Sequence, residues 1–416
     1  MALGAAAALG LQMTAAAAPR TGPLPTISLR RGMNLWPWFS LTREFPAPRT
    51  DFGWPPYQEG RAVPTRDDLK ALRSSGIDFI RLPVDPGPHV AFTGARRAEL
   101  MDEVARAIEL ALAEDLSVIL NLHPNGGTHH FTPNNLVGGL DAPMFGEYLD
   151  LVGRVADRLA RFPPSRVAFE PLNEPPQTCS SVDWLVIQAA MVRTARSAAP
   201  RLTVVVTGAC GSMIAGLEAF EPGAVDDTNV IYTFHFYEPY VFSHLGAPWM
   251  RREPMYRYLN SVPWPYTAGS KPATLAAVTA RMAADHTTPP AVKSEIMATI
   301  ERVLTQYFDG QPGRWLIERY FKRVTAWAER YGIDRGRILL GEFGALRTDE
   351  RFVAAPAADR ARYIRDVRET AEAAGMPWAF WNFFDGMGLT IDDRSRAFDP
   401  AIAAALGLRV PGSVDR

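Results

Sequence analysis

The feature that most constrains the fold of this chain is a regular alternation of short apolar segments with longer segments of helical character. The short segments are rich in Val, Ile, Leu and Phe and have the length of buried strands. Strands that alternate with helices form a parallel sheet, because each helix returns the chain to the same end of the sheet. Eight such segments occur: residues 31–36, 77–84, 117–123, 167–174, 202–208, 229–237, 338–344 and 378–384.

Several of the intervening segments have the pattern of amphipathic helices. In residues 96–114 the apolar residues recur every three or four positions. Thr65 begins another helix with Asp68 three residues later, which is a capping-box pattern, and Gly76 ends it. A similar helix at residues 363–374 precedes the last strand.

Eight strand–helix units within 416 residues predict an α/β fold, namely a closed (β/α)8 barrel. The alternative is an open, doubly wound sheet built from the same units. No Ser/Gly-rich linker interrupts residues 19–416, so we expect them to form a single barrel domain.

Two segments are longer than barrel loops need to be. Residues 37–64 follow the first strand, and residues 238–337 follow the sixth. The second segment spans about 100 residues, where a loop and its helix need roughly 30. It contains two predicted helices, at 291–308 and 313–331, one of which we expect to be the regular barrel helix. Its aromatic first part, residues 249–266, either shapes a substrate groove or forms a small local core.

Residues 1–18 are small and apolar and end in three alanines, which is typical of a signal peptide, although no positive charge precedes Arg20. We therefore expect a secreted or periplasmic protein. No other segment approaches the ~20 apolar residues of a membrane span, so stable membrane insertion is not expected. Cys179 and Cys210 each follow a predicted strand, and the sequence leaves open whether they form a disulfide or remain free thiols.

The overall composition is that of a folded protein, with 47% hydrophobic and 21% charged residues. The formal net charge of −1 argues against a nucleic-acid partner, which would require a basic surface. An uncharged polysaccharide or oligosaccharide fits this charge better, and we expect the protein to be a monomer.

Polar residues gather where the predicted strands end. In a barrel, the carboxyl ends of the strands carry the active site. Each buried polar group must find a partner, so several of them on successive strands indicate a functional site better than packing. These residues are Arg81, His123, Asn173, Glu174, His235, Tyr237, Glu342 and Trp381.

Glu174 and Glu342 give this set its chemistry. Two carboxyl groups without a cluster of Cys and His ligands fit the hydrolysis of a glycosidic bond. One group protonates the departing oxygen, and the other attacks the anomeric carbon or activates water. This reaction requires neither a metal ion nor an organic cofactor.

The same segments resemble glycoside hydrolase family five, the cellulase family in the clan A of retaining glycosidases. The resemblance extends from about residue 31 to residue 384. It is carried by residues 31–35 (RGMNL), 80–83 (IRLP), 120–123 (LNLH), 172–175 (LNEP), 235–237 (HFY), 341–344 (GEFG) and Trp381.

The resemblance implies that Glu174 is the general acid and then the general base. It implies that Glu342 is the nucleophile, which Arg81 and Tyr237 hold in the ionised form. Asn173 would bind the 2-hydroxyl group of the sugar whose bond is cleaved.

Four further roles follow from the same resemblance. His235 would orient Glu174, and His123 would bind sugar hydroxyl groups. Trp381 would form the floor beneath the sugar, and Trp36 would either stack on a neighbouring sugar or belong to the core. For Glu170 we expect a structural role, as the anchor of an Arg or His side chain.

The chain departs from the family pattern on the third strand. The family often has Asp at the position of Asn121 and a second His at the position of Pro124. These changes leave the sugar contacts of this strand undecided. His129 and His130 in the following loop either replace a lost contact or are simply exposed.

The sequence thus predicts a retaining hydrolase of a β-linked glucan, with β-1,4-glucan as the favoured substrate. β-Mannan, β-1,3-glucan and glycolipid substrates remain open, as does the choice between endo and exo action. A transglycosylase would use the same residues, and a non-catalytic carbohydrate-binding barrel is the alternative from a different class.

Overall fold

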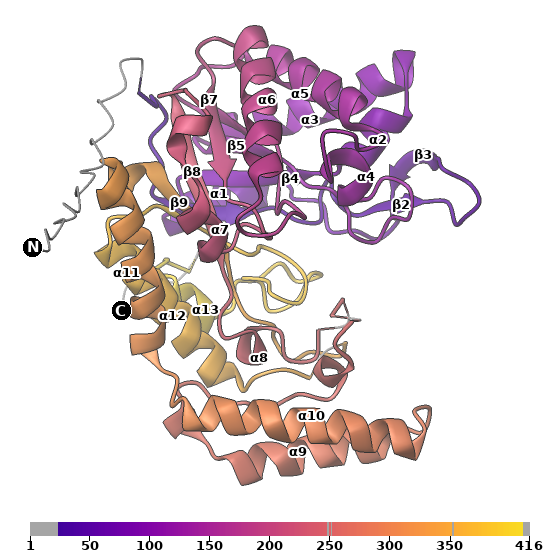
Figure 1. Ribbon diagram of the computed structural model, residues 1–416, viewed down its shortest axis with the longest axis vertical. Coiled ribbons are helices and arrows are strands. Elements are labelled where there is room, and N and C mark those ends of the chain that lie inside the picture. Colours follow the sequence, from indigo (N-terminus) through magenta and orange to yellow (C-terminus); the bar gives the residue numbers. More distant parts are fainter. Residues whose placement is uncertain (1–23, 248, 251, 352, 411–416) are drawn as a thin grey trace, which may run out of the picture.

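Eight parallel strands close into a barrel in the computed structural model (Figure 1), which describes residues 24–247, 249–250, 252–351 and 353–410. The order around the barrel is β1, β10, β9, β8, β7, β6, β5 and β4, so neighbouring strands follow one another along the chain. The predicted (β/α)8 barrel is therefore confirmed, and the open sheet is wrong. The expected signal peptide, residues 1–18, lies outside the described residues. The barrel strands are β1 (Arg31–Asn34), β4 (Phe79–Val84), β5 (Ser117–Leu122), β6 (Val167–Glu170), β7 (Thr203–Thr207), β8 (Val230–Phe236), β9 (Ile338–Phe343) and β10 (Trp378–Phe380).

Every barrel strand is shorter than the sequence predicts, and β6 and β10 are shortened most. β6 ends at Glu170 rather than at Glu174, because Pro171 has no N–H group to continue the ladder. β10 ends at Phe380, so Trp381 follows the strand instead of belonging to it. Glu174 and Trp381 therefore lie at the beginning of the loops that follow β6 and β10.

Helices surround the barrel, and the predicted ones at residues 65–76, 96–114 and 363–374 are present within a few residues. Thr65 caps α1 through the expected capping box, and Gly76 ends it with a left-handed φ of 112°. The helices are α1 (Arg66–Ser75), α2 (Pro86–Ala91), α3 (Gly94–Ala113), α4 (Pro133–Val137), α5 (Phe145–Leu159), α6 (Val182–Ala198), α7 (Ile214–Ala219), α8 (Tyr240–Ser243), α9 (Lys271–Ala284), α10 (Pro290–Asp309), α11 (Arg314–Tyr331), α12 (Ala357–Ala373) and α13 (Pro400–Ala405). Short 3-10 helices occupy Pro222–Ala224, Pro254–Arg257, Tyr266–Ala268 and Arg335–Arg337.

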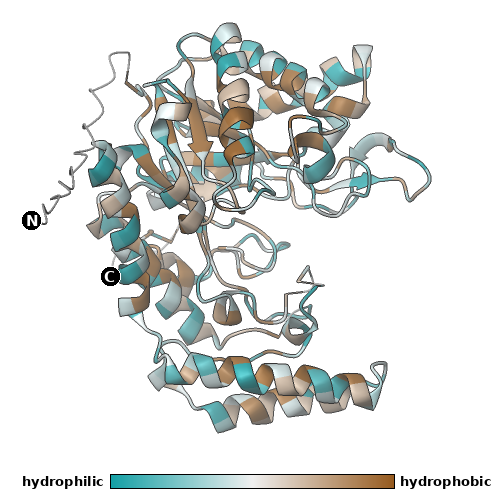
Figure 2. Cartoon of the chain, in the orientation of Figure 1, coloured by the Kyte–Doolittle hydropathy of each residue, from teal (hydrophilic) through white to brown (hydrophobic). Residues whose placement is uncertain are grey.

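The interior of the barrel changes from apolar to polar along the strands. Near the amino ends, Phe79, Ile119 and Val205 belong to a small apolar cluster that is separate from the large core around the barrel. Figure 2 shows the apolar strands enclosed by helices with hydrophilic outer faces. Two residues further along β4 and β6, Arg81 and Glu170 are fully buried. Side chains two residues apart point to the same face of a strand, so these polar groups fill the barrel beneath its carboxyl end.

The two long segments add structure to the carboxyl end of the barrel. Residues 37–64 form an antiparallel hairpin of β2 (Thr42–Glu44) and β3 (Phe52–Tyr57). The insertion after β8 contains α9 and α10, which pack side by side at the end of the molecule far from α5 and α6 (Figure 1), and α11 is the regular barrel helix. The helix α9 is not among the helices predicted from the sequence.

The aromatic first part of the insertion contributes to the main hydrophobic core, rather than to a small local core, and to the lining of a cleft at the carboxyl end of the barrel. Tyr256, Tyr258 and Trp264 are buried in the core, whereas the side chain of Trp249 is 48% exposed. A disulfide joins Cys179 to Cys210, with 4.6 Å between their Cα atoms. Among the residues that the structure describes, no helix has the length and apolar character needed to cross a membrane.

Candidate active site

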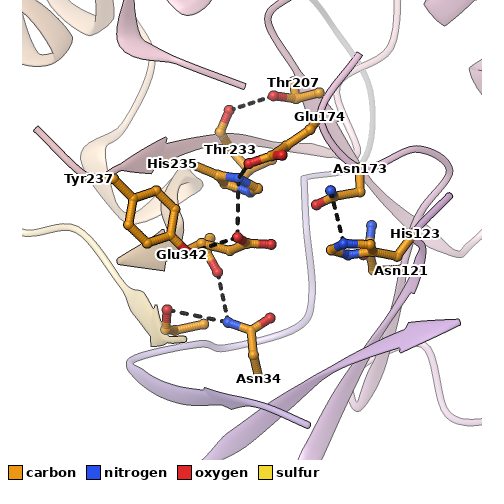
Figure 3. A network of polar contacts seen from close by, with 12 residues as sticks. Asn34, Asn121, His123, Asn173, Glu174, Thr207, Thr233, His235, Tyr237 and Glu342 are labelled. Carbon is orange, nitrogen blue, oxygen red and sulfur yellow. Dashed lines mark hydrogen bonds and ion pairs between the residues drawn. The ribbon is translucent and has the colours of Figure 1, made fainter. Parts of the chain in front are cut away.

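A cleft of about 500 Å³ opens at the carboxyl end of the barrel. Of the residues predicted from the sequence, six line this cleft, and Arg81, Asn173 and His235 support them from below. The structure therefore brings the predicted set together, and Figure 3 shows His123, Asn173, Glu174, His235, Tyr237 and Glu342. The six lining residues are Trp36, His123, Glu174, Tyr237, Glu342 and Trp381.

The guanidinium of Arg81 is the centre of the polar network beneath the cleft. It binds both carboxylate oxygens of Glu170, at 2.7 and 2.8 Å, and Oε1 of Glu342 at 2.7 Å. It also donates to the side-chain oxygens of Asn34 at 2.9 Å and Asn173 at 2.7 Å. A planar donor with five N–H groups suits this arrangement, since it can hold several acceptors in fixed directions. The expectation that Glu170 anchors an arginine is confirmed.

Glu342 on β9 is held from two sides. Arg81 binds Oε1, and the hydroxyl group of Tyr237 donates to Oε2 at 3.0 Å. The side chain is only 4% exposed, and burial raises the pKa of this carboxyl group. His235, Arg81 and the Tyr237 hydroxyl act in the opposite direction and lower it. The residue before Glu342 is a glycine, Gly341. A Cβ atom at this position would collide with the side chain of Thr233 and approach the ring of His235.

Glu174 lies above β6 with a more open environment. Its side chain is 42% exposed, and its Oε1 atom lies 2.8 Å from Nδ1 of His235. A carboxylate oxygen of Glu174 and one of Glu342 lie within 4.8 Å of each other. β6 and β9 are three strands apart in the barrel, and His235 on β8 lies between the two carboxyl groups.

His235 interacts with both carboxyl groups through one ring nitrogen. Its Nδ1 atom is 2.8 Å from Glu174 and 3.5 Å from Oε2 of Glu342. Burial by itself lowers the pKa of His235, but the two carboxylates outweigh this effect and the pKa is raised. A proton on Nδ1 is therefore stabilised, and His235 can donate it in a hydrogen bond to Glu174.

His123 and Asn173 orient each other at the floor of the cleft. The amide nitrogen of Asn173 lies 3.3 Å from Nε2 of His123, and Nδ1 of His123 lies 3.1 Å from the side-chain oxygen of Asn121. An amide nitrogen only donates and an amide oxygen only accepts, so His123 carries its proton on Nδ1. Burial, with Arg81 nearby, keeps the pKa of His123 well below its usual value, which favours this neutral form. Asn121, on the third barrel strand, thus accepts the hydrogen bond that fixes the tautomer of His123.

Trp381 and Trp36 form an aromatic surface along one side of the cleft. The ring of Trp381 stacks on His123 at 5.5 Å, and the ring of Trp36 lies 6.5 Å from it. Both tryptophans are partly exposed and line the cleft, so Trp36 does not belong to the closed core. A flat apolar face of this kind can pack against the C–H face of a sugar ring.

Several residues of the cleft wall are not predicted from the sequence. His244 and Asp385 line the cleft, from the insertion after β8 and the loop after β10. No periodicity marks residues in loops, so only the fold could identify these two. His129 and His130, in contrast, lie outside the cleft lining; their backbone N–H groups bind Glu44.

One group of residues in the described part of the chain has ligand atoms close enough together to hold a metal ion. It consists of Glu174, His235 and Glu342, with one ligand atom from each within 4.8 Å of the others. The same three residues include the two carboxyl groups that the sequence predicts as the catalytic pair.

Comparisons with known proteins identify the family of the chain. Residues 43–386 match the family Cellulase (glycosyl hydrolase family 5). Endoglucanase 3 of Fibrobacter succinogenes is 24% identical over 330 residues, which cover 76% of this chain and 45% of that protein. Cellodextrinase A of Ruminococcus flavefaciens is 25% identical over 183 residues, which cover 44% of this chain and 54% of that protein. The matches thus span about half the length of these two relatives.

Solved structures share the fold at lower identity. Cellulose synthase subunit Z from Clostridioides difficile has a TM-score of 0.65 and 20% identity, with 91% of this chain and 99% of that chain covered. A hyperthermophilic endo-β-1,4-glucanase in complex with substrate has a TM-score of 0.63 and 22% identity, with 92% and 97% covered. Thermotoga maritima Cel5A in complex with mannotriose has a TM-score of 0.64 and 20% identity, with 92% and 98% covered.

Proposed function

The chain belongs to the cellulase family, glycosyl hydrolase family 5, and from this premise we propose that it hydrolyses a β-linked glucan with retention of configuration at the anomeric carbon. The observation that carries the proposal is the approach of the Glu174 and Glu342 carboxyl groups to within 4.8 Å. Retaining glycosidases hold their two carboxyl groups about 5 Å apart, whereas inverting enzymes leave a wider gap for a water molecule.

In the first step Glu342 attacks the anomeric carbon. The bond from this carbon to the leaving oxygen breaks, and Glu174 gives its proton to that oxygen. Arg81 and Tyr237 hold the two oxygens of Glu342, so the attacking carboxylate has a fixed direction. The product of this step is a glycosyl group bound covalently to Glu342.

In the second step Glu174 acts as a base. It takes a proton from a water molecule, whose oxygen attacks the anomeric carbon and releases Glu342. His235 donates a hydrogen bond to Glu174, and this bond is kept as Glu174 changes between its protonated and ionised forms. Two inversions at one carbon restore the original configuration. A sugar hydroxyl group in place of water would give transglycosylation by the same residues.

Around this centre we assign the remaining residues to the sugar. Asn173, which Arg81 and His123 orient, would bind the 2-hydroxyl group, a contact that strengthens in the transition state. His123 would contact a neighbouring hydroxyl group, and Trp381 and Trp36 would stack beneath the sugars.

For the substrate we propose a β-1,4-linked glucan. The relatives named above include an endoglucanase and a cellodextrinase, and one structural neighbour is an endo-β-1,4-glucanase. A β-mannan is the second candidate, because Thermotoga maritima Cel5A has been solved with mannotriose. β-1,3-Glucans complete the set of substrates to be compared.

We also propose that the protein is exported. The apolar segment 1–18 has the composition of a signal peptide, and a disulfide such as Cys179–Cys210 persists in oxidising compartments. Mass spectrometry of the protein from the periplasm or culture medium should find a mature chain without these residues. Recovery of the intact chain from the cytoplasm alone would contradict export.

The experiment that tests the function is a screen of defined β-glucans and mannans, in which the anomer of the first product is recorded by NMR. We expect a β-anomer first and the highest rate on a β-1,4-glucan. An α-anomer would contradict retention, and absence of hydrolysis in the whole screen would favour a binding protein.

Two substitutions assign the carboxyl groups. Glu342→Gln should lower kcat by several orders of magnitude on every substrate. Glu174→Ala should lower kcat/KM about 10²- to 10⁴-fold for sugar leaving groups and much less for activated aryl glycosides, which need no acid. Glu59→Gln, at an exposed surface position, is the control that should leave both unchanged.

A further inference from the structure

We propose that the disulfide between Cys179 and Cys210 is a positioning element for Glu174, which fixes the carboxyl group of this residue against His235. The inference rests on the acid/base role proposed above. The disulfide joins the loop after β6 to the turn after β7, and neither cysteine lines the cleft. Its effect on the reaction must therefore pass through the backbone.

The surroundings of Glu174 do little to fix its side chain. Glu342 is 4% exposed and has hydrogen bonds to both carboxylate oxygens, whereas Glu174 is 42% exposed. Among the described residues, His235 is the one hydrogen-bonding partner of the Glu174 carboxyl group. The φ angle of Glu174 is 40°, in the left-handed region that residues other than glycine rarely adopt. Such a conformation persists only where the neighbouring chain is held in place.

The turn after β7 holds the chain that follows Glu174. The N–H group of Gly211 donates to the carbonyl of Pro175 at 2.9 Å, and that of Cys210 donates to the carbonyl of Gln177, also at 2.9 Å. The disulfide from Cys210 to Cys179 is the third connection. Residues 175–179 are thus attached to two consecutive residues of one turn.

The same turn also holds the partner of Glu174. The carbonyl of Ser212 accepts a hydrogen bond of 2.8 Å from the N–H group of His235. Residues 210–212 are therefore hydrogen-bonded both to the segment that follows Glu174 and to the backbone of His235. A movement of this turn would change the separation of the two side chains directly.

The turn itself has a conformation that needs support. Cys210 and Ser212 have φ angles of 49° and 57°, so both adopt the left-handed conformation without being glycine. Residues with a side chain adopt this conformation only at a cost in free energy. With the disulfide open, the turn can relax toward ordinary backbone angles, and the two hydrogen bonds to residues 175–179 would weaken with it.

The consequence should be selective for acid catalysis. Glu342 is positioned by β9 and by hydrogen bonds from Arg81 on β4 and from Tyr237, and these two bonds involve neither the loop nor the turn that the disulfide joins. Opening the disulfide should therefore disturb the proton donor and spare the nucleophile. A merely structural disulfide would instead affect all substrates equally.

The test compares the intact enzyme with Cys179→Ser/Cys210→Ser and with wild type treated with dithiothreitol. The dithiothreitol thiols are oxidised to a cyclic disulfide as the two cysteines become thiols. The quantity measured is kcat/KM, which reports the steps through formation of the glycosyl enzyme. One substrate is a cello-oligosaccharide, and the other is an aryl β-cellobioside with a dinitrophenyl leaving group.

We expect a loss of about ten- to a hundred-fold on the oligosaccharide, since small displacements of a catalytic group have effects of this size. On the aryl glycoside the loss should not exceed about three-fold, because its leaving group needs no proton. Dithiothreitol should have no effect on the double variant. Ile300→Ala in α10, a buried residue far from the cleft, controls for lost stability and should not separate the two substrates.

Two results would overturn the positioning role. One is an equal loss on both substrates, which includes the case in which the reduced protein unfolds. The other is unchanged kinetics after the thiols have been verified by alkylation. If the untreated wild type hydrolyses neither substrate nor any other β-glucan, the proposed function itself has failed, which is a distinct observation.

Discussion

The Nη1 atom of Arg81 lies 2.7 Å from Oε1 of Glu342 in a part of the barrel from which solvent is excluded. The same guanidinium binds Glu170 through two further hydrogen bonds. One cation thus faces two buried carboxylates, of which only Glu342 lines the cleft. This arrangement pairs Glu170 with the cation and directs the remaining donors of Arg81 at Glu342, Asn34 and Asn173.

Arg81→Lys should retain the positive charge but lose the fixed directions of the donors. We expect kcat to fall about 10²- to 10³-fold, as for the removal of a preorganised donor. Steady-state kinetics on the best β-glucan gives the value. Arg323→Lys, in the partly exposed pair with Glu218, is the matched control and should be silent. Near-normal kcat in Arg81→Lys would mean that charge alone is sufficient.

Tyr237→Phe should change the pH dependence of the reaction. The Tyr237 hydroxyl lowers the pKa of Glu342, so its removal raises that pKa further. In the proposed mechanism Glu342 reacts in the ionised form, so the acid limb of kcat/KM should move to higher pH. The pH–rate profile of Tyr240→Phe, in the same aromatic cluster, should match that of wild type. If the acid limb did not move in Tyr237→Phe, the Tyr237 hydroxyl would have no effect on the pKa of Glu342.

Trp381→Ala should weaken substrate binding. Loss of an aromatic face under the sugar should raise KM or the Kd of a bound oligosaccharide roughly ten-fold, which corresponds to about 1.4 kcal/mol. Trp36→Ala should weaken binding only of oligosaccharides long enough to reach the second ring. Calorimetric titration of Glu342→Gln carrying each substitution measures binding without turnover. Unchanged affinity would mean that Trp381 serves only to pack against His123.

Asp85 should make the stability of the protein depend on pH. It is buried at the beginning of α2, where it accepts hydrogen bonds from Thr42 and from the N–H group of Gly87, and burial raises its pKa to about 7. The folded protein then binds a proton that the unfolded chain has released, so stability decreases as the pH rises from about 4 through 7. The loss is at most about 4 kcal/mol, at about 1.4 kcal/mol for each pKa unit.

Asp85→Asn should flatten this part of the stability profile. Urea unfolding of wild type, Asp85→Asn and the exposed-site control Glu59→Gln at pH 5 and pH 8 provides the comparison. The difference between the two pH values should shrink in Asp85→Asn and persist in the control. If the difference in the free energy of unfolding between pH 5 and pH 8 were equal in all three proteins, the ionisation of Asp85 would not affect stability.

The candidate site was largely predictable because its residues end strands. Period-two side-chain alternation and the position of each strand are local properties, and a parallel barrel gathers all carboxyl ends at one face. Arg81, His235 and Glu342 could therefore be placed together from the chain alone. The same reasoning extended β6 to Glu174, although Pro171 ends the strand earlier.

Residues in the loops were less predictable. The sequence leaves the pairing of Cys179 and Cys210 open, because the distance between two cysteines depends on where the turns after β6 and β7 lie. His244 and Asp385 have no pattern that marks them, yet both line the cleft. The helix α9 has three buried residues, Thr274, Val278 and Met282, and its partner α10 packs against it only in the folded protein.

By itself, the sequence indicated the eight strands, favoured the barrel over an open sheet and identified the two carboxyl groups, one after β6 and one on β9, because these follow from periodicity and from residue type. Only the tertiary structure decided how far apart Glu174 and Glu342 lie, and which of them is open to solvent. Distance and burial arise from contacts between segments more than a hundred residues apart. No local pattern in the chain encodes such contacts.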